Sequence, residues 1–211
     1  LRREGRRHFV SGMALGAAAL GLGLSGCGGG GGPEVRFAHG VASGDPLSDR
    51  VILWTRLSTE ATGEVQVVWE VSSRPDFTSI VRSGSTATSA ARDMTVKVDV
   101  TGLSPATSYW YRFQANGNVS PAGRTRTLPT GSVAQVRLAV FSCANHPAGY
   151  FNAYADAAAR TDLDATVHLG DYIYEYGAGG YATQSAAAMG RAPQPATEIL
   201  SLSDYRARHR A

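Results

Sequence analysis

A strand, a helix and a second strand in close succession restrict the fold of residues 132–211 more than any other feature of the chain. Apolar runs at residues 136–142 and 165–169 lie on either side of an Ala-rich stretch with helical spacing at residues 150–160. Two strands joined through a helix over about 35 residues have to pair in parallel, with a right-handed crossover. Their carboxyl ends then meet at one edge of a sheet, the edge at which open α/β sheets bind ligands. The sequence therefore predicts the start of an α/β domain here.

Residues 34–131 follow a different pattern, which predicts an all-β sandwich. Short apolar runs are separated by turn residues, and within the runs apolar and polar side chains alternate, as in strands with one buried and one wet face. An antiparallel module of about one hundred residues fits this pattern. The expected strands are Val35–Val41, Val51–Leu57, Val65–Val71, Met94–Val100 and Tyr109–Ala115.

One stretch of this module, Leu103–Phe113, resembles the Leu-x-Pro-x-Thr-x-Tyr-x-Tyr-x-Val sequence of fibronectin type III domains. In those domains the first Tyr closes a corner by hydrogen-bonding back to the chain, so Tyr109 is expected to do the same here. The large aromatic residues are expected in the core rather than on a ligand-binding surface, because cores use aromatic side chains heavily. They are Trp54, Trp69, Tyr109 and Trp110.

Residues 1–26 are predicted to be an export signal. Their apolar stretch is shorter than the roughly 20 residues that a transmembrane helix needs. Arg6–Val10 resembles the twin-arginine motif of the bacterial route that exports folded proteins. Leu24–Cys27 resembles a lipobox, which predicts a lipid on Cys27 and a Gly-rich tether at residues 27–33. The alternative is an ordinary signal cleaved nearby, with Cys27 as a spare thiol.

Charge and cysteine content exclude two classes of protein. The chain has 20 Lys and Arg against 17 Asp and Glu, and the positive excess comes from residues 1–26, so no nucleic-acid role is expected. Two Cys residues do not make a disulfide-stapled miniprotein. If Cys27 carries lipid, Cys143 is left alone in an oxidising compartment. Either a bound ligand or a buried, inert position would protect its thiol.

Three chemically reactive side chains follow the two expected parallel strands. Cys143 comes after the first strand, Asp171 after the second, and Tyr174 lies three residues further on. Thiolate and phenolate suit a Lewis-acidic cation such as ferric iron, and a carboxylate can bridge to a harder ion such as calcium. Two neighbouring cations can clamp the oxygens of a phosphoester during hydrolysis. The alternative roles are a turn or cap for Asp171 and loop packing for Tyr174.

Several segments together resemble the PhoD family of exported alkaline phosphatases and phosphodiesterases. They are Phe141–Asn145, His168–Gly177, His39–Pro46, Val51–Arg56 and Leu202–Arg208. The resemblance implies a fibronectin- or Ig-like sandwich followed by a calcineurin-like metallophosphoesterase domain that holds Fe(3+) and Ca(2+). It also implies that Cys143 binds iron, that Asp171 bridges iron and calcium, and that Tyr174 supplies a phenolate to iron.

The function expected from this resemblance is hydrolysis of phosphate esters with a metal-activated water, in the periplasm or at the cell surface. Export through the twin-arginine machinery and a membrane anchor on Cys27 are expected as well. The alternative is an envelope-anchored binding module without catalysis. The chain is interpreted as part of a longer protein, with residues 132–211 as the first part of a truncated catalytic domain. Further metal ligands and catalytic groups are expected downstream of residue 211, so the fragment alone is expected to be inactive.

Overall fold

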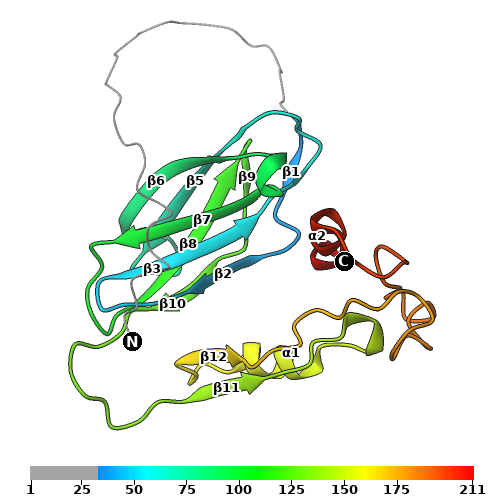
Figure 1. Cartoon of the computed structure of the whole chain (residues 1–211). Helices are drawn as coiled ribbons and strands as arrows, with labels where there is room; N and C mark the ends of the chain where they lie inside the picture. Colours follow the sequence, from blue (N-terminus) through cyan, green and yellow to red (C-terminus); the bar gives the residue numbers. More distant parts are fainter. Residues whose placement is uncertain (1–32) are drawn as a thin grey trace, which may run out of the picture. The chain divides into compact units, whose positions relative to one another are not determined.

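The computed structural model describes residues 33–211, and the chain divides into two compact units between Leu128 and Pro129 (Figure 1). The predicted export signal of residues 1–26, the lipidation site Cys27 and most of the Gly-rich tether lie outside the described residues. Among the residues that are described, none of the helices has the length and apolar character that crossing a membrane requires.

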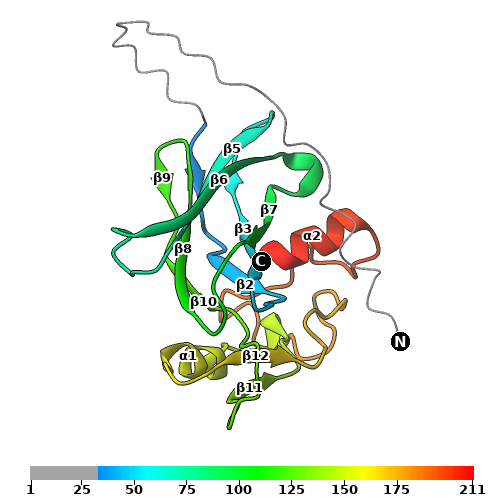
Figure 2. The ribbon, with the colours of Figure 1, turned by 90° about the vertical axis from the view of Figure 1, so that its left-hand side faces the viewer.

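The first unit consists of antiparallel strands. One sheet has the order β10-β8-β5-β6, with β9 beside β8, and a second has the order β2-β3-β7; β1 pairs with β4. Figures 1 and 2 show the three-stranded sheet lying over one face of the larger sheet. The strands are β1 (Val35–Arg36), β2 (Val41–Gly44), β3 (Arg50–Arg56), β4 (Ser58–Thr59), β5 (Val65–Ser72), β6 (Ile80–Thr88), β7 (Thr95–Thr101), β8 (Ser108–Ala115), β9 (Asn118–Val119) and β10 (Gly123–Arg126); a short 3-10 helix, Ala90–Arg92, precedes β7.

Strand alternation builds a single core between these two sheets. In β3 every second side chain is buried, Val51, Leu53 and Thr55 among them, and β8 buries Tyr111 and Phe113 in the same way. Apolar side chains from β5 and β7 complete the cluster. The sequence prediction of alternating inward and outward faces is confirmed for these strands.

The same alternation corrects the prediction for the tryptophans. Tyr109 is buried as expected, whereas Trp54, Trp69 and Trp110 are half-buried. Trp54 follows the inward-facing Leu53, and Trp110 lies between two inward-facing tyrosines, so both indoles point to the outer face. Trp69 packs against the edge of the core and lies opposite Gly84 of β6, where a Cβ atom would be 2.6 Å from its ring.

The expected aromatic corner is present at the start of β8. The backbone N–H of Ser104 donates a hydrogen bond of 2.9 Å to the phenol oxygen of Tyr109. Because Tyr109 is buried and Ser104 lies in the preceding turn, this bond ties the turn to the core.

Two features of the sheets differ from the expected strands. The run Val35–Val41 is not one strand: a turn closed by the bond from Gly40 N–H to Phe37 O (3.0 Å) separates β1 from β2. Gly40 has φ 65°, a conformation that glycine adopts without strain. Strands β6 and β10 were not predicted, because their sequences, IVRSGSTAT and GRTR, are largely polar and carry little strand signal of their own. Their pairing with β5 and β8 selects them.

The second unit begins with the predicted strand–helix–strand pattern. Strands β11 (Leu138–Phe141) and β12 (Ala165–His168) pair in parallel, and helix α1 (Asn152–Ala159) lies between them in the chain after a 3-10 turn, His146–Ala148. Helix α2 (Leu202–Arg210) begins with a capping box in which Ser201 and Asp204 satisfy each other's backbone N–H groups. The predicted parallel pairing is confirmed.

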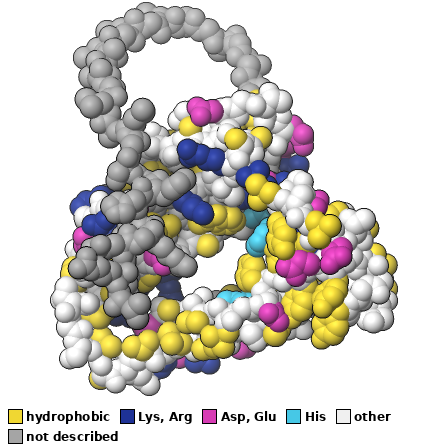
Figure 3. Space-filling view, viewed as in Figure 1, with side chains coloured by type: hydrophobic (Ala, Val, Ile, Leu, Met, Phe, Trp, Pro, Cys, Tyr) yellow, Lys and Arg dark blue, Asp and Glu magenta, His cyan; other side chains and the backbone are white. Residues whose placement is uncertain are grey.

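Apolar burial in this unit is slight. Within residues 129–211, all of which the structure describes, the buried apolar side chains other than Pro147 and Pro193 are Ala144, Ala186 and Ile199. Strand residues such as Leu138 and Val140 remain exposed, and Figure 3 shows hydrophobic side chains along the surface of this unit. The unit is therefore held together mainly by its backbone and polar contacts.

Candidate metal centre

The candidate site lies where β11 and β12 end. Backbone pairing continues beyond the strands: Leu169 N–H donates to Phe141 O (2.8 Å), Cys143 N–H to Gly170 O (3.1 Å) and Ala144 N–H to Asp171 O (2.8 Å). The two loops are thus joined residue by residue. This pairing brings Cys143 and Asp171 side by side, as the sequence predicted for the carboxyl ends of neighbouring parallel strands.

Both of these residues have an unusual backbone conformation. Cys143 has φ 62° and Asp171 has φ 52°, in the left-handed region that residues with a Cβ atom rarely adopt. Such a conformation costs about 1–3 kcal/mol per residue and is found most often at functional sites. Gly170, with φ 126°, makes the sharp turn that precedes Asp171. The loops are therefore held in a shape that their own residues do not prefer.

Three side chains converge on one point. Cys143 Sγ lies 3.8 Å from Asp171 Oδ2, and the phenol of Tyr174 donates to the same oxygen at 3.2 Å. The thiol is exposed, so the alternative of a buried, inert Cys143 is wrong. Asp171 is also exposed and Tyr174 is half-buried.

The electrostatics of the cluster favour a cation. The pKa of Tyr174 is raised above that of an ordinary tyrosine. The largest cause is the hydrogen bond between its phenol and Cys143, followed by desolvation and then by the hydrogen bond with Asp171. Without a cation, the phenol therefore stays protonated beside the thiol of Cys143 and the carboxylate of Asp171. A cation bound between the three side chains would favour the ionised phenolate instead.

The donor set fits a metal ion. Bonds to a metal ion such as zinc are about 2.3 Å long from sulfur and about 2.1 Å from oxygen, so a sulfur and an oxygen bound to one ion lie at most about 4.4 Å apart. The distances from Asp171 Oδ2 to Cys143 Sγ (3.8 Å) and to the phenol oxygen of Tyr174 (3.2 Å) are both shorter. Among residues 33–211 there is no group of three or more His, Cys, Asp and Glu side chains that could hold a metal ion. The cluster contributes one Cys, one Asp and a Tyr, so a complete coordination sphere needs further ligands.

Comparison with known proteins identifies the family. The model of the PhoD-like phosphatase N-terminal domain matches residues 31–129, and the model of the PhoD-like phosphatase matches residues 138–211. The chain belongs to the PhoD-like phosphatase family. Alkaline phosphatase D of Bacillus subtilis (strain 168) is 39% identical over 222 residues, which cover 97% of this chain and 37% of that protein.

A solved structure described as the structure of PhoD superposes on this PhoD-like chain with a TM-score of 0.76 at 41% identity. The match covers 82% of this chain and 34% of the solved one. The chain thus spans little more than a third of the length of the relatives it matches.

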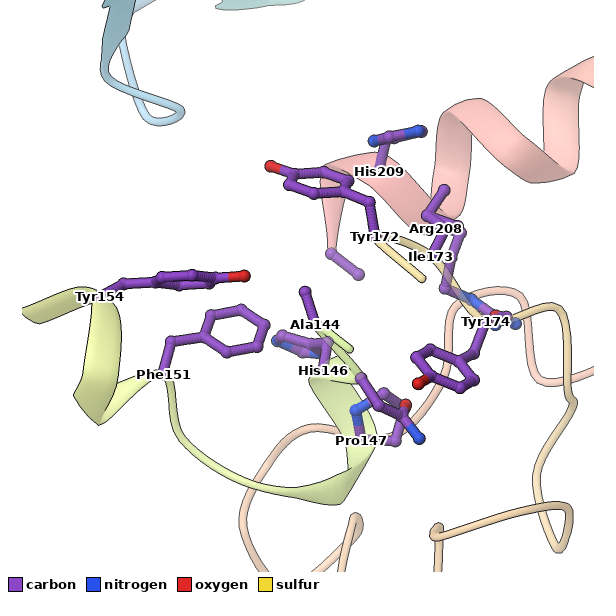
Figure 4. A pocket seen from close by; sticks show the side chains of 12 residues that line it. Ala144, His146, Pro147, Phe151, Tyr154, Tyr172, Ile173, Tyr174, Arg208 and His209 are labelled. Atoms are coloured by element: carbon purple, nitrogen blue, oxygen red, sulfur yellow. The ribbon is translucent and has the colours of Figure 1, made fainter. Parts of the chain in front are cut away.

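A pocket of about 270 Å³ adjoins the cluster in this PhoD-like chain (Figure 4). Its walls include Ala144 and His146 from the first loop, Tyr172 and Tyr174 from the second, and His209 from α2. The rings of Tyr172 and His209 are stacked, with centroids 5.9 Å apart. Burial, followed by the charges of Arg191 and Arg208, lowers the pKa of His146.

Two neighbours of the cluster, His168 and Glu175, have partners of their own, whereas the buried Nδ2 of Asn145 has no hydrogen-bond partner among the described residues. Asn145 precedes the 3-10 turn without making a side-chain cap bond, so a capping role does not explain it. His168 Nε2 lies 3.0 Å from the phenol oxygen of Tyr154, and Glu175 Oε1 accepts a 2.9 Å bond from the phenol of Tyr205. Neither side chain has a contact with the Cys143–Asp171–Tyr174 cluster among the hydrogen bonds of the described residues.

Arg208 was not singled out from the sequence, although its side chain is buried beside the Tyr174 loop. An Arg in the segment SLSDYRARHRA looks like one of several solvated charges. The only sequence signal is its position three residues after Tyr205, which places the two on one face of the helix.

Proposed function

We propose that the full-length protein containing this chain is an exported, metal-dependent phosphoesterase of the alkaline phosphatase or phosphodiesterase type. The observation that carries the proposal is the convergence of a thiol, a carboxylate and a phenol at the carboxyl edge of two parallel strands. Membership of a phosphatase family supports the reaction class. Phosphate esters are the proposed substrates.

Cys143, Asp171 and Tyr174 are the proposed ligands. Cys143 and Tyr174 would hold ferric iron, Fe(3+), and Asp171 would hold both that iron and calcium, Ca(2+). When bound, the ions supply Lewis-acid activation of water and neutralise phosphate charge. These residues would hold the ions at the carboxyl edge of the parallel strands, where the paired loops bring Cys143 and Asp171 together.

The organisation of the protein follows the same proposal. Residues 34–131 are assigned to a fibronectin- or Ig-like sandwich and residues 132–211 to the first part of a calcineurin-like metallophosphoesterase domain. The corner bond of Tyr109 supports the first assignment and the parallel pair β11–β12 the second. Residues 1–26 are assigned to twin-arginine export and Cys27 to a lipid anchor on the membrane.

The two cysteines of the chain provide a matched test. In the full-length protein, Cys143→Ser is expected to remove most of the bound iron and most of the turnover of an aryl phosphate ester, because a hydroxyl replaces the thiolate ligand. Cys27→Ser is expected to keep metal and turnover but to move the protein from the membrane fraction to the soluble fraction. Elemental analysis, steady-state kinetics and fractionation measure these outcomes.

The outcomes separate the parts of the proposal. If Cys143→Ser keeps its iron and turnover, the assignment of Cys143 is wrong. A Cys27→Ser protein that stays in the membrane fraction would contradict the lipid anchor alone. A wild-type protein with neither metal nor phosphoesterase activity would favour an envelope-anchored binding module instead.

A further inference from the structure

The side chain of Arg208 makes an unusual set of contacts near the end of α2. It is 8% exposed, and five hydrogen bonds run from its guanidinium to backbone carbonyl oxygens. Nη1 donates to Tyr174 O (2.5 Å) and Tyr176 O (3.1 Å). Nε donates to Gln194 O (3.0 Å), and Nη2 to Pro195 O (3.0 Å) and Thr197 O (3.4 Å). One rigid group therefore joins two loop segments.

The first of these segments carries the candidate ligand Tyr174. The carbonyls that Nη1 binds belong to Tyr174 itself and to the residue two positions later. Glu175, between them, is held from two further directions: its carbonyl accepts from Ile199 N–H at 3.1 Å, and its side chain accepts from the phenol of Tyr205. Contacts with α2 and Ile199 thus fix the backbone of residues 174–176, which sets the direction of the Tyr174 phenol.

Apolar contact does not account for this attachment of α2. The one buried residue of the helix is Arg208, and its apolar residue Leu202 is 66% exposed. Burying a guanidinium is unfavourable, and desolvation lowers the pKa of Arg208. The carbonyl bonds are what offsets that desolvation. Apolar side chains could attach the helix without the desolvation penalty of a buried guanidinium. The position of this charge against the Tyr174 carbonyl therefore indicates a role beyond attaching the helix.

We propose that Arg208 is a positioning residue for Tyr174: by binding the carbonyls of Tyr174 and Tyr176 it holds the phenol toward Cys143 and Asp171. The inference rests on the proposed function, because it takes Tyr174 as a metal ligand. Arg208 itself touches neither metal nor substrate in this role. Outer contacts of this kind orient the ligand that they hold, and their loss weakens metal binding about tenfold to a hundredfold.

The experiment uses the full-length protein with the variants Arg208→Gln and Arg208→Lys. Arg210→Gln, at an exposed position of the same helix, is the matched control, and Tyr174→Phe is the reference for loss of the ligand. Three quantities are measured: iron retained during titration with a chelator, the visible absorption of a phenolate on ferric iron, and hydrogen exchange of segments 172–177 and 194–199. A merely structural Arg208 would leave the absorption band of the retained iron unchanged.

The expected results follow from the geometry. Arg208→Gln retains iron about tenfold to a hundredfold less tightly, its absorption band weakens toward that of Tyr174→Phe, and both segments exchange faster. Arg208→Lys keeps a charge but has no planar fork, so it gives an intermediate loss. Arg210→Gln behaves as wild type in all three measurements.

The outcomes that overturn the inference are distinct from those that overturn the proposed function. If Arg208→Lys and Arg208→Gln keep the absorption band and iron retention of wild type while segment 194–199 exchanges faster, Arg208 is only an anchor and the inference is wrong. If Arg208→Gln does not yield folded protein, Arg208→Lys decides on the same measurements. A wild-type protein without bound metal would instead overturn the proposed function, and the inference with it.

Discussion

The two units of the chain are stabilised in different ways. Residues 33–128 enclose one apolar cluster of 16 buried side chains, drawn from strands of both sheets. Residues 129–211 bury three apolar side chains besides Pro147 and Pro193, and the buried guanidinium of Arg208 makes five hydrogen bonds there. The first unit depends on the hydrophobic effect, which is non-directional, and the second on hydrogen bonds, which fix particular atoms in place.

The candidate metal ligands lie in the unit that buries few apolar side chains. A parallel sheet is normally covered on both faces, yet Leu138, Val140 and Val167 of the β11–β12 pair are exposed within the described chain. The candidate ligands are in this sparsely buried unit, on loops in left-handed conformations. Regions with few buried apolar contacts open most readily, and metal binding adds stability to the folded form of such regions. A metal ion bound by the candidate ligands would therefore stabilise the second unit rather than the sandwich.

The difference between the two units predicts the largest loss of stability for truncation of a core side chain in the first unit. Phe113→Ala removes a fully buried ring from the centre of β8 and is expected to destabilise the first unit by about 3–5 kcal/mol. Val140→Ala, at a strand position that is 55% exposed, is expected to change the stability of the second unit by less than about 0.5 kcal/mol. Hydrogen exchange measured by mass spectrometry resolves the two units. Losses of similar size at both positions would show that the exposed strand face is covered in the full-length protein.

A smaller effect is expected at the aromatic corner of the first unit. Tyr109→Phe keeps the buried ring but removes the oxygen that accepts from Ser104 N–H. Because Ser104 is exposed, water can replace the lost acceptor, and the expected loss is about 1 kcal/mol, the ordinary net value of one hydrogen bond. Denaturant unfolding measures it. A loss as large as that of Phe113→Ala would mean that a single hydrogen bond matters as much as the core.

The sequence predicted those parts of the structure that depend on local pattern. Alternation placed the strands that bury Leu53 and Phe113, and the strand–helix–strand pattern brought Cys143 and Asp171 to one edge. Alternation also predicts the outward orientation of Trp54, because Trp54 lies between two inward-facing residues, and at this position it outweighs the general preference of aromatic side chains for cores.

Other features depend on contacts between distant segments and leave no local pattern. Strand β6 is polar and forms because β5 offers it a partner. The burial of Arg208 depends on carbonyls at residues 174–176 and 194–197, which come together only in the folded chain. The geometry of a hydrogen-bonded unit is therefore harder to predict from sequence than that of a unit with an alternating apolar core.

The smallest predicted effect tests the polar character of the second unit through pH. Burial, followed by the charges of Arg191 and Arg208, lowers the pKa of His146 below the ordinary histidine value of 6.5, so the folded state favours the neutral ring. The unfolded chain binds a proton as the pH falls past that value, whereas the folded chain resists. The contribution of His146 to stability is therefore present above about pH 6.5 and is lost as the pH falls through the lowered pKa of the folded state.

His146→Gln is expected to reduce the loss of stability of the second unit between pH 7.5 and pH 5, measured by hydrogen exchange corrected for the intrinsic pH dependence of exchange. His209→Gln, at an exposed position of α2, is expected to follow wild type, and the first unit should be unchanged in both variants. If His146→Gln follows wild type as well, neither burial nor the two arginines perturb this ring in the folded state. The bonds of Arg191 to His146 O (2.7 Å) and of Arg208 to its carbonyls would then stabilise the unit as backbone contacts alone, without electrostatic coupling to the neighbouring histidine.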